Sequence, residues 1–265
     1  MVIWLLAVVI GFTLGLLGGG GSILTVPVFV YVGHFDPKTA IAMTFVVVGV
    51  ASLFGAVNHW RAGTVVPRVA VTFGAITMVG AVGGARLATL LAGTTQLLIL
   101  SVAIIAAALS MLRGGVRSEA ETAPTSWRAA LRPALVAVGL GVGVLTGVVG
   151  VGGGFLIVPA LIVLAKVPTR SAVGTSLVVI AMNSMAALAA HATTTDIPFT
   201  FVATFTAIAV VGVFGGVRAA HVLPAATLRR VFAVFLLLVG SAILYQSRGV
   251  LSSAFTSISQ SRSVG

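Results

Sequence analysis

The chain has 265 residues, of which 59% are hydrophobic and 7% are charged, and its 15 Lys and Arg against 4 Asp and Glu give a net charge of +11. A soluble domain carries about 25% charged residues, so this composition excludes a soluble globular protein and predicts an all-α integral membrane protein. Most of the basic residues lie at the ends of apolar stretches, where they meet lipid headgroups. We therefore expect a lipid bilayer, and no nucleic acid, as a partner.

Ten apolar stretches follow one another along the chain, five in each half. The third, fourth and fifth stretches of each half are long enough to cross a bilayer, which takes roughly 20 residues. The second stretch of each half is too short, and it follows a short partner across a Gly cluster, so we expect each pair to turn near the middle of the membrane. The pattern predicts 8 to 10 transmembrane segments. The stretches run approximately over residues 2–18, 22–35, 37–59, 64–92, 94–112, 134–150, 154–166, 169–191, 197–222 and 226–247.

Polar composition marks the predicted domain boundaries. Residues 113–132 contain Glu119, Glu121 and four arginines, and we interpret them as a cytoplasmic linker between a first transmembrane repeat (1–112) and a second (133–247). The tail 248–265 is rich in Ser and has no apolar run, which predicts disorder. The first 18 residues lack a basic segment and a cleavage site, so we expect a retained span rather than a signal peptide.

The second half repeats the first without insertion or deletion, at an offset of 132 positions (143 minus 11). Many matches at one fixed offset indicate an internal duplication. In a chain this apolar, the duplication predicts a transporter-type architecture with the binding site where the repeats meet. Corresponding pairs include Gly11/Gly143, Gly15/Gly147, Gly18/Gly150, Gly20/Gly152, Gly21/Gly153, Pro27/Pro159, Ser52/Ser184, His59/His191, Gly80/Gly212, Gly84/Gly216 and Arg86/Arg218.

The distribution of Lys and Arg predicts how the repeats are oriented. If each short pair spans twice or returns to its own side, eleven basic residues lie on one face and four on the other. If each short pair were one broken span, the division would be eight to seven. The positive-inside rule favours the first arrangement. Each repeat then crosses an odd number of times, which predicts two inverted-topology repeats, each with three full spans and a short glycine-broken helix pair, and both termini outside.

The Gly clusters at 18–21 and 150–154 are the sharpest local signal. Consecutive small residues break a helix in an apolar environment, where unpaired backbone amides are costly. The helices that begin after each cluster direct free N–H groups inward, which suits an anion. Close packing is the alternative, and we favour it for the Gly-x-x-x-Gly spacings. The polar residues near the clusters can bind substrate or hydrogen-bond between helices. The predicted substrate-binding residues are Gly20, Gly21, Ser22, Thr44, Gly152, Gly153, Gly154, Ser176 and Asn183.

Two further matched pairs of side chains carry or can acquire charge. His59 and His191 end corresponding stretches and are the candidates for proton coupling, with capping of a helix C-terminus or headgroup contact as the simpler interpretation. Arg86 and Arg218 each follow a Gly-Gly pair. They are either gates for anions at opposite mouths or ordinary membrane anchors.

The sequence carries no catalytic motif. It lacks cysteine, an intramembrane carboxylate pair, H-E-x-x-H and G-x-S-x-G. We therefore expect no disulfide, no metal site, no cofactor and no enzymatic activity.

The pattern G-x-x-x-G-x-x-G-x-G-G-x-x-x-x-x-P at 11–27 and 143–159, with A-x-A-M-T at 40–44 and A-x-G-T-S at 172–176, resembles the signature of the sulfite exporter TauE/SafE family. The resemblance covers residues 3–247 and implies a multi-pass carrier of sulfur-containing or other small organic anions in the bacterial plasma (inner) membrane, acting in export. Ser22 stands where the second half has Gly154, so the two half-sites are not chemically identical. By motif position, the resemblance assigns the site to Gly20, Gly21, Gly152, Gly153, Pro27 and Pro159.

The sequence thus predicts a secondary transporter that exports a small anion such as sulfite, an organosulfonate or a related organic anion, by alternating access around a midplane site. An anion channel with the same cavity is the main alternative. A non-transporting assembly subunit is a third, which the Gly clusters in both halves disfavour. The sequence leaves open whether the chain is a monomer or a homodimer.

Overall fold

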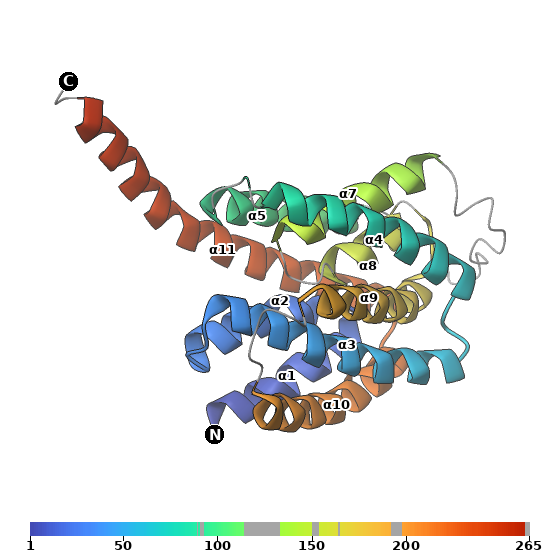
Figure 1. The fold of residues 1–265 in the computed structure, drawn as a ribbon. Helices are drawn as coiled ribbons and strands as arrows, with labels where there is room; N and C mark the ends of the chain where they lie inside the picture. The colour runs from blue at the N-terminus through green and yellow to red at the C-terminus, as the bar shows by residue number, and fades with distance from the viewer. Residues whose placement is uncertain are drawn as a thin grey trace.

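The computed structural model describes residues 1–88, 90, 93–113, 133–149, 154–163, 165–191 and 198–262. These residues form helices and short connections, with no strand among them (Figure 1). The predicted all-α class is confirmed. In chain order the elements are α1 (Val2–Leu17), α2 (Gly20–Pro27), the π-helical turn η1 (Val28–Val32), α3 (Pro37–Arg61), α4 (Pro67–Ala88), α5 (Gly93–Arg113), α7 (Pro133–Val149), α8 (Gly154–Val163), α9 (Thr169–His191), α10 (Phe199–Val222) and α11 (Ala225–Arg262).

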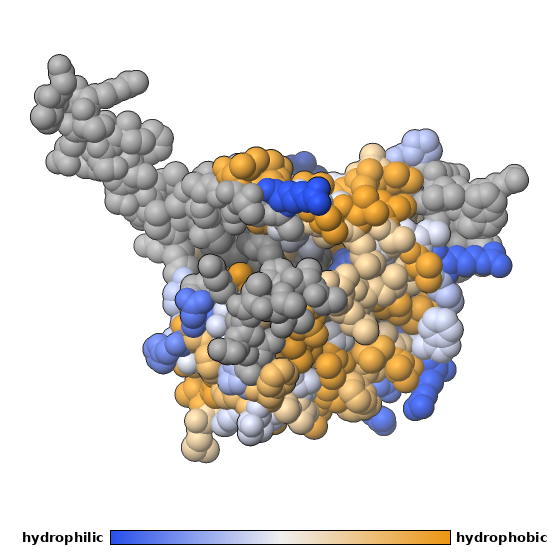
Figure 2. Space-filling view, viewed as in Figure 1, coloured by the Kyte–Doolittle hydropathy of each residue, from blue (hydrophilic) through white to orange (hydrophobic). Residues whose placement is uncertain are grey.

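The described helices have the length and composition of membrane spans. Five of them, α3, α4, α9, α10 and α11, contain segments long and apolar enough to cross a bilayer. Shorter apolar helices include Val2–Leu17, Gly20–Val32 and Gly154–Val163. On the face drawn in Figure 2, apolar side chains cover the middle, and most strongly hydrophilic ones lie toward the ends of the bundle. The chain is therefore a multi-pass membrane protein, and the total of 8 to 10 segments stays a prediction.

Proline positions explain several helix ends. Pro37, Pro67 and Pro133 begin α3, α4 and α7, where a missing N–H costs nothing because the first turn has no intrahelical acceptor. Pro27 instead lies inside a helix, at the end of α2. It removes one backbone hydrogen bond, and the chain continues as the π-helical turn η1.

The two halves are duplicated in local structure as well as in sequence. The Gly33 N–H donates to Val28 O at 2.9 Å, and at the corresponding position the Ala165 N–H donates to Ala160 O at 3.2 Å. The positive φ of 56° at His34 also recurs at the corresponding Lys166. The same turn therefore follows the short second helix in each half.

The most extensive helix contacts join one half to the other. α1 packs along α10, and its counterpart α7 packs along α4, the counterpart of α10. α3 packs on its own counterpart α9, and α5 on its counterpart α11. α3 also packs on α10, and α9 also packs on α4 and α8. We group α1, α2, α3 and α10 as a first bundle and α4, α7, α8 and α9 as a second bundle, with α3 and α9 packed together between them, so that each bundle contains helices from both halves (Figure 1).

Small residues bring the backbones of α1 and α10 together. A Cβ added at Gly11 would overlap the backbone of Ala209, and one added at Gly216 would overlap the carbonyl of Phe12. The same relation holds in the second bundle, where a Cβ at Gly143 would overlap the Thr77 carbonyl. The packing interpretation of the Gly-x-x-x-Gly spacing is thus confirmed at Gly11 and Gly143.

α3 and α9 run in opposite directions. Near the middle of the pair, Gly49 of α3 faces Ser184, and toward the end of α3, Gly174 of α9 faces His59. The residue number rises along one helix as it falls along the other, so the two copies of the same helix are antiparallel.

One end of the molecule gathers most of the described basic residues. The C-terminal ends of α3 and α10 meet there, with the rings of His59 and His221 5.0 Å apart. The N-terminal end of α9 joins them, since Arg170 donates from Nη2 to Leu223 O at 3.1 Å. We call this the basic end. Its described basic residues are Arg61, Arg68, Arg113, Lys166, Arg170, Arg218, Arg229 and Arg230.

The predicted disorder of the tail 248–265 is wrong for residues up to Arg262. α11 continues through the Ser-rich segment to Arg262 and extends beyond the rest of the bundle (Figure 1). Adding residues to an existing helix is much easier than starting one, and no proline interrupts this segment, so its polarity alone does not end the helix. Residues 263–265 and 114–132 of the predicted linker lie outside the described residues.

Candidate functional site

The break between α1 and α2 is fixed by a residue from the other half. α1 ends at Gly18, whose φ of 69° is in the left-handed region that favours glycine. The hydroxyl of Ser176 on α9 lies 2.7 Å from Gly18 O and 2.8 Å from Val173 O. A predicted site residue therefore holds the turn of the opposite repeat.

The N-terminal ends of the short helices α2 and α8 meet. A Cβ at Gly19, the residue before α2, would overlap the carbonyl of Gly154, the first residue of α8. The N-terminal ends of α2 and α8 therefore touch backbone to backbone, and Gly154 is buried. The contact between Gly19 and Gly154 leaves no room for a ligand between them in this conformation.

The other predicted residues of the first cluster are buried and packed. Gly20 faces the ring of Phe235, and Gly21 faces the backbone of α1. The Ser22 hydroxyl donates to Gly19 O at 2.8 Å. Close packing accounts for Gly20 and Gly21 here, whereas Gly152 and Gly153 lie outside the described residues. Of the motif prolines, Pro27 ends α2 and Pro159 lies within α8.

Buried polar side chains line the middle of the membrane helices. Thr44 donates to Ala40 O of its own helix at 2.8 Å. Asn183 lies 3.3 to 3.4 Å from the Thr77 hydroxyl of α4, which is the helix-to-helix role that we gave as its alternative. Sequence reasoning did not select the matched pair Ser52 and Ser184. Both are buried, and among the described residues neither hydroxyl has a hydrogen-bond partner.

His59 is not paired with His191. Because α3 and α9 are antiparallel, the C-terminal ends of these two helices lie at opposite ends of the molecule, and the His191 side chain is outside the described residues. The partner of His59 is His221 of α10, at 5.0 Å between ring centroids. Duplication could not reveal His221, since its counterpart in the first half is Thr89.

The matched arginines lie at opposite ends of the molecule. Arg218 is exposed near the basic end of α10, and Arg86 is exposed near the far end of α4. Sequence reasoning gave no role to Arg170 and Arg229, which bind the carbonyls of Leu223 and Met111 near the C-terminal ends of α10 and α5. Both compensate the negative end of a helix dipole.

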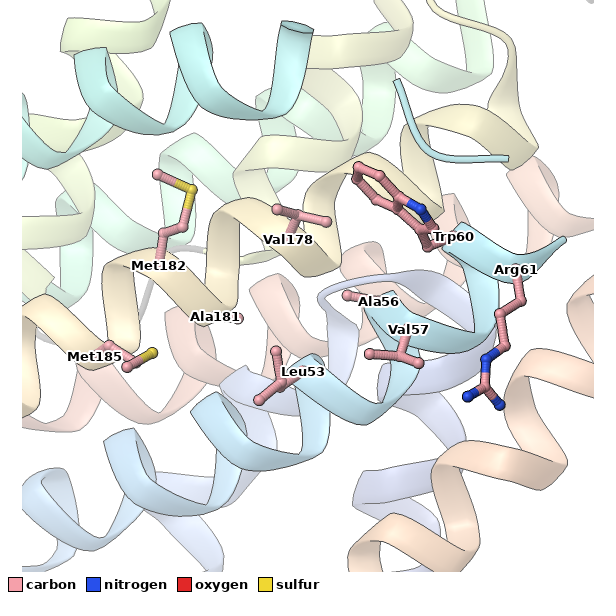
Figure 3. Close-up of a pocket in the computed structure, with 9 residues that line it drawn as sticks. All are labelled: Leu53, Ala56, Val57, Trp60, Arg61, Val178, Ala181, Met182 and Met185. Carbon is pink, nitrogen blue, oxygen red and sulfur yellow. The ribbon is translucent and has the colours of Figure 1, made fainter. Parts of the chain in front are cut away.

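A groove of about 350 Å³ lies between α3 and α9 (Figure 3). Its apolar side chains come from both helices, and Leu53 and Met185, which occupy corresponding positions, both line it. Trp60 and Arg61 lie at its basic end. An anion would find few hydrogen-bond donors along this surface, so we do not place the substrate there. The lining residues are Leu53, Ala56, Val57, Trp60, Arg61, Val178, Ala181, Met182 and Met185.

A duplicated set of membrane helices, with a short second helix in each copy and the N-terminal ends of these two helices in contact, is typical of secondary transporters. The chain belongs to the sulfite exporter TauE/SafE family, whose model matches residues 3–243. The resemblance predicted from the glycine signature is confirmed.

Similar proteins have names that agree with this class. The chain is 35% identical over 173 residues to a "Probable membrane transporter protein" of Xylella fastidiosa strain Temecula1. The aligned segment covers 64% of this chain and 66% of that protein. It is 26% identical over 186 residues to the "Probable membrane transporter protein YdhB" of Bacillus subtilis, and this aligned segment covers 68% of this chain and 74% of YdhB. No solved structure matches the chain.

Proposed function

We propose that the protein is a secondary carrier, acting in export across the bacterial plasma membrane, for a small anion such as sulfite, an organosulfonate or a related organic anion. The observation that carries the proposal is the contact between Gly19 and Gly154, where the N-terminal ends of α2 and α8 meet in the interior. Each end presents backbone N–H groups and the positive end of a helix dipole. A site between them attracts an anion without any charged side chain.

The composition of the helices favours an anion over a cation. None of the helices in the described residues contains Asp or Glu, the side chains that bind cations within membranes. A sulfonate or sulfite has several oxygens around one sulfur, so it accepts hydrogen bonds from several amides at once. Hydroxyls near the breaks, such as those of Ser22 and Ser176, add donors when the helices separate.

The direction of the helices supports inverted repeats. Corresponding helices α3 and α9 are antiparallel. A rotation that superimposes one half on the other therefore also turns it upside down in the membrane. In such an arrangement, opening one face and closing the other are equivalent motions of the two bundles. The contact of Gly19 with Gly154 then belongs to a closed arrangement, and the anion enters when the first and second bundles separate on one side.

Labelling from each side of the membrane tests the orientation. The chain has no cysteine, so Ser118→Cys in the linker and Ser257→Cys in the tail each provide a single reactive thiol. We expect an impermeant maleimide to label Ser257→Cys from outside and Ser118→Cys only after the membrane is opened. Labelling of both from the same side contradicts inverted repeats with a cytoplasmic linker.

Flux through proteoliposomes tests the function and separates a carrier from a channel. We expect saturable uptake of sulfite, methanesulfonate or acetate that is accelerated when the same unlabelled anion is inside, because a carrier returns faster when loaded. Uptake that neither saturates nor responds to internal anion favours the channel alternative. Uptake of sodium or potassium, with no response to any anion tested, contradicts the proposal.

A further inference from the structure

His59, which is buried, and His221, which is half-buried, lie side by side at the basic end of the first bundle. Their rings are tilted by 39°, with centroids 5.0 Å apart. His59 is 1% exposed. The Nε2 atoms of both rings are buried, and within the described part of the chain neither has a hydrogen-bond partner. Buried polar nitrogens normally have partners, so two unpartnered ones side by side call for a functional explanation.

Hydrogen-bond geometry assigns the free lone pair of His59. The Thr64 hydroxyl lies 3.0 Å from His59 O and donates its single proton there. The same oxygen lies 2.8 Å from His59 Nδ1, so Nδ1 must carry the proton of that second bond. In the neutral ring, Nε2 therefore has a bare lone pair, which is a vacant proton-binding position.

Among the described residues, no carboxylate lies on the helices that surround the pair. α9 lies closest to the His59 side chain at Gly174, which has no side chain of its own. The charged groups on these elements are cations: Arg61 on α3, Arg218 on α10, and Arg170 on α9, whose guanidinium binds Leu223 O. α1 has no ionisable side chain.

We propose that His59 and His221 together form a proton-binding site that takes up one proton with each anion transported. This inference rests on the anion transport proposed above but not on export, since a proton and an anion that move together follow the sum of their two gradients in either direction. Histidine is the side chain that changes charge nearest neutral pH. Two imidazolium rings 5.0 Å apart would repel each other, so the pair holds one proton rather than two.

The position of the pair explains how the proton and the anion become coupled. His59 of the first bundle lies against Gly174 of the second bundle, so the interface between the bundles is closed here. An added positive charge in this closed interface is costly unless an opposite charge accompanies it. A bound anion supplies that charge. The proton alone therefore keeps the basic end open, and the proton with the anion allows it to close.

A pH gradient across proteoliposomes of the full chain tests the coupling. The probe is labelled methanesulfonate, which stays ionised at the pH values used, with the membrane potential clamped by potassium and valinomycin. With the outside more acid, we expect wild-type protein to accumulate the anion about tenfold for each pH unit, because one proton accompanies each anion. His221→Asn should abolish this accumulation, because the pair then loses one of its two rings.

The control variant is His34→Asn, which changes an exposed histidine at the other end of the molecule. Its φ of 56° is tolerated by Asn, so we expect wild-type accumulation. Accumulation by His221→Asn equal to that of wild type overturns the proton site. Wild-type counterflow without accumulation overturns it too and leaves anion transport intact, whereas absence of wild-type counterflow with every anion overturns the proposed function itself.

Proton uptake on binding gives a second reading that does not require transport. In weakly buffered detergent solution near neutral pH, we expect saturating methanesulfonate to draw about one proton per wild-type chain from a pH indicator dye. His59→Asn and His221→Asn should each remove most of this uptake. Anion binding without proton uptake by the wild type contradicts the inference even if both variants fail to transport.

Discussion

The packing of α1 on α10 differs in kind from the packing of α3 on α9. In the first, Gly11 and Gly216 bring the helix backbones together. In the second, the glycines face side chains: Gly49 faces Ser184, and Gly55 faces the methyl groups of Leu177. A groove also opens between α3 and α9. Backbone contact permits one close fit, whereas side chains can change rotamer. We therefore expect α1 and α10 to move as one body and the α3–α9 interface to rearrange during transport.

Neighbouring glycines on α10 test the rigid interface, where we expect the largest effect. Gly216→Ala places a methyl group against the Phe12 carbonyl and 2.7 Å from Leu16 N, whereas in Gly215→Ala the nearest atom is Phe12 Cδ2 at 3.6 Å. Overpacking against backbone should lower the free energy of unfolding by about 1–3 kcal/mol in Gly216→Ala, with little change in Gly215→Ala. Thermal unfolding in detergent measures both, and equal melting temperatures would contradict the rigid fit.

The contact between Gly19 of the first bundle and Gly154 of the second brings backbone against backbone, as does the contact between Gly18 and Val173. Gly19→Ala would keep Gly19 and Gly154 apart, so the closed arrangement should become unfavourable while each bundle stays folded. We expect the counterflow rate to fall by about tenfold, which corresponds to a barrier higher by about 1.4 kcal/mol. Gly83→Ala is the matched control, because a Cβ there meets nothing within 4 Å. Equal rates in both variants would show that transport does not depend on this contact.

The helices were predictable because apolar length and Gly or Pro punctuation are local signals. The predicted stretch 37–59 corresponds to α3 (Pro37–Arg61), and 154–166 corresponds to α8 (Gly154–Val163). Duplication also showed which residues correspond. It could not show which residues touch, because that depends on how the copies are arranged in space. His59 illustrates the difference, since its counterpart His191 ends a helix at the far side of the molecule and its neighbour His221 has no matching histidine.

The candidate site was predictable only in part for the same reason. Glycine clusters predicted the helix breaks, and Gly19 and Gly154 meet where the halves join. Gly20 and Gly21, however, face Phe235 and the backbone of α1, contacts that depend on tertiary packing and leave no pattern in the sequence. The unpartnered hydroxyls of Ser52 and Ser184 were hidden similarly, because a serine in an apolar stretch usually bonds to its own helix and, within the described residues, these two do not.

Ser176 should give the smallest of these effects. Its hydroxyl links α9 of the second bundle to the Gly18 carbonyl of the first, so Ser176→Ala removes a hydrogen bond across the interface that we expect to rearrange. A neutral hydrogen bond contributes about 1 kcal/mol. When the interface opens, water can donate to the Gly18 carbonyl in place of the Ser176 hydroxyl, so the effect of losing this hydroxyl is small. We expect the counterflow rate to change by about two- to fivefold.

Ser110→Ala is the control, because the Ser110 hydroxyl donates within its own helix, to Ala107 O at 2.7 Å. If Ser110→Ala changes the rate as much as Ser176→Ala does, the bond to Gly18 has no special part in transport. If only Ser176→Ala changes it, the direction separates two cases. A slower rate means that the bond stabilises the turn at Gly18 throughout the cycle, and a faster rate means that the bond must break before the bundles can separate.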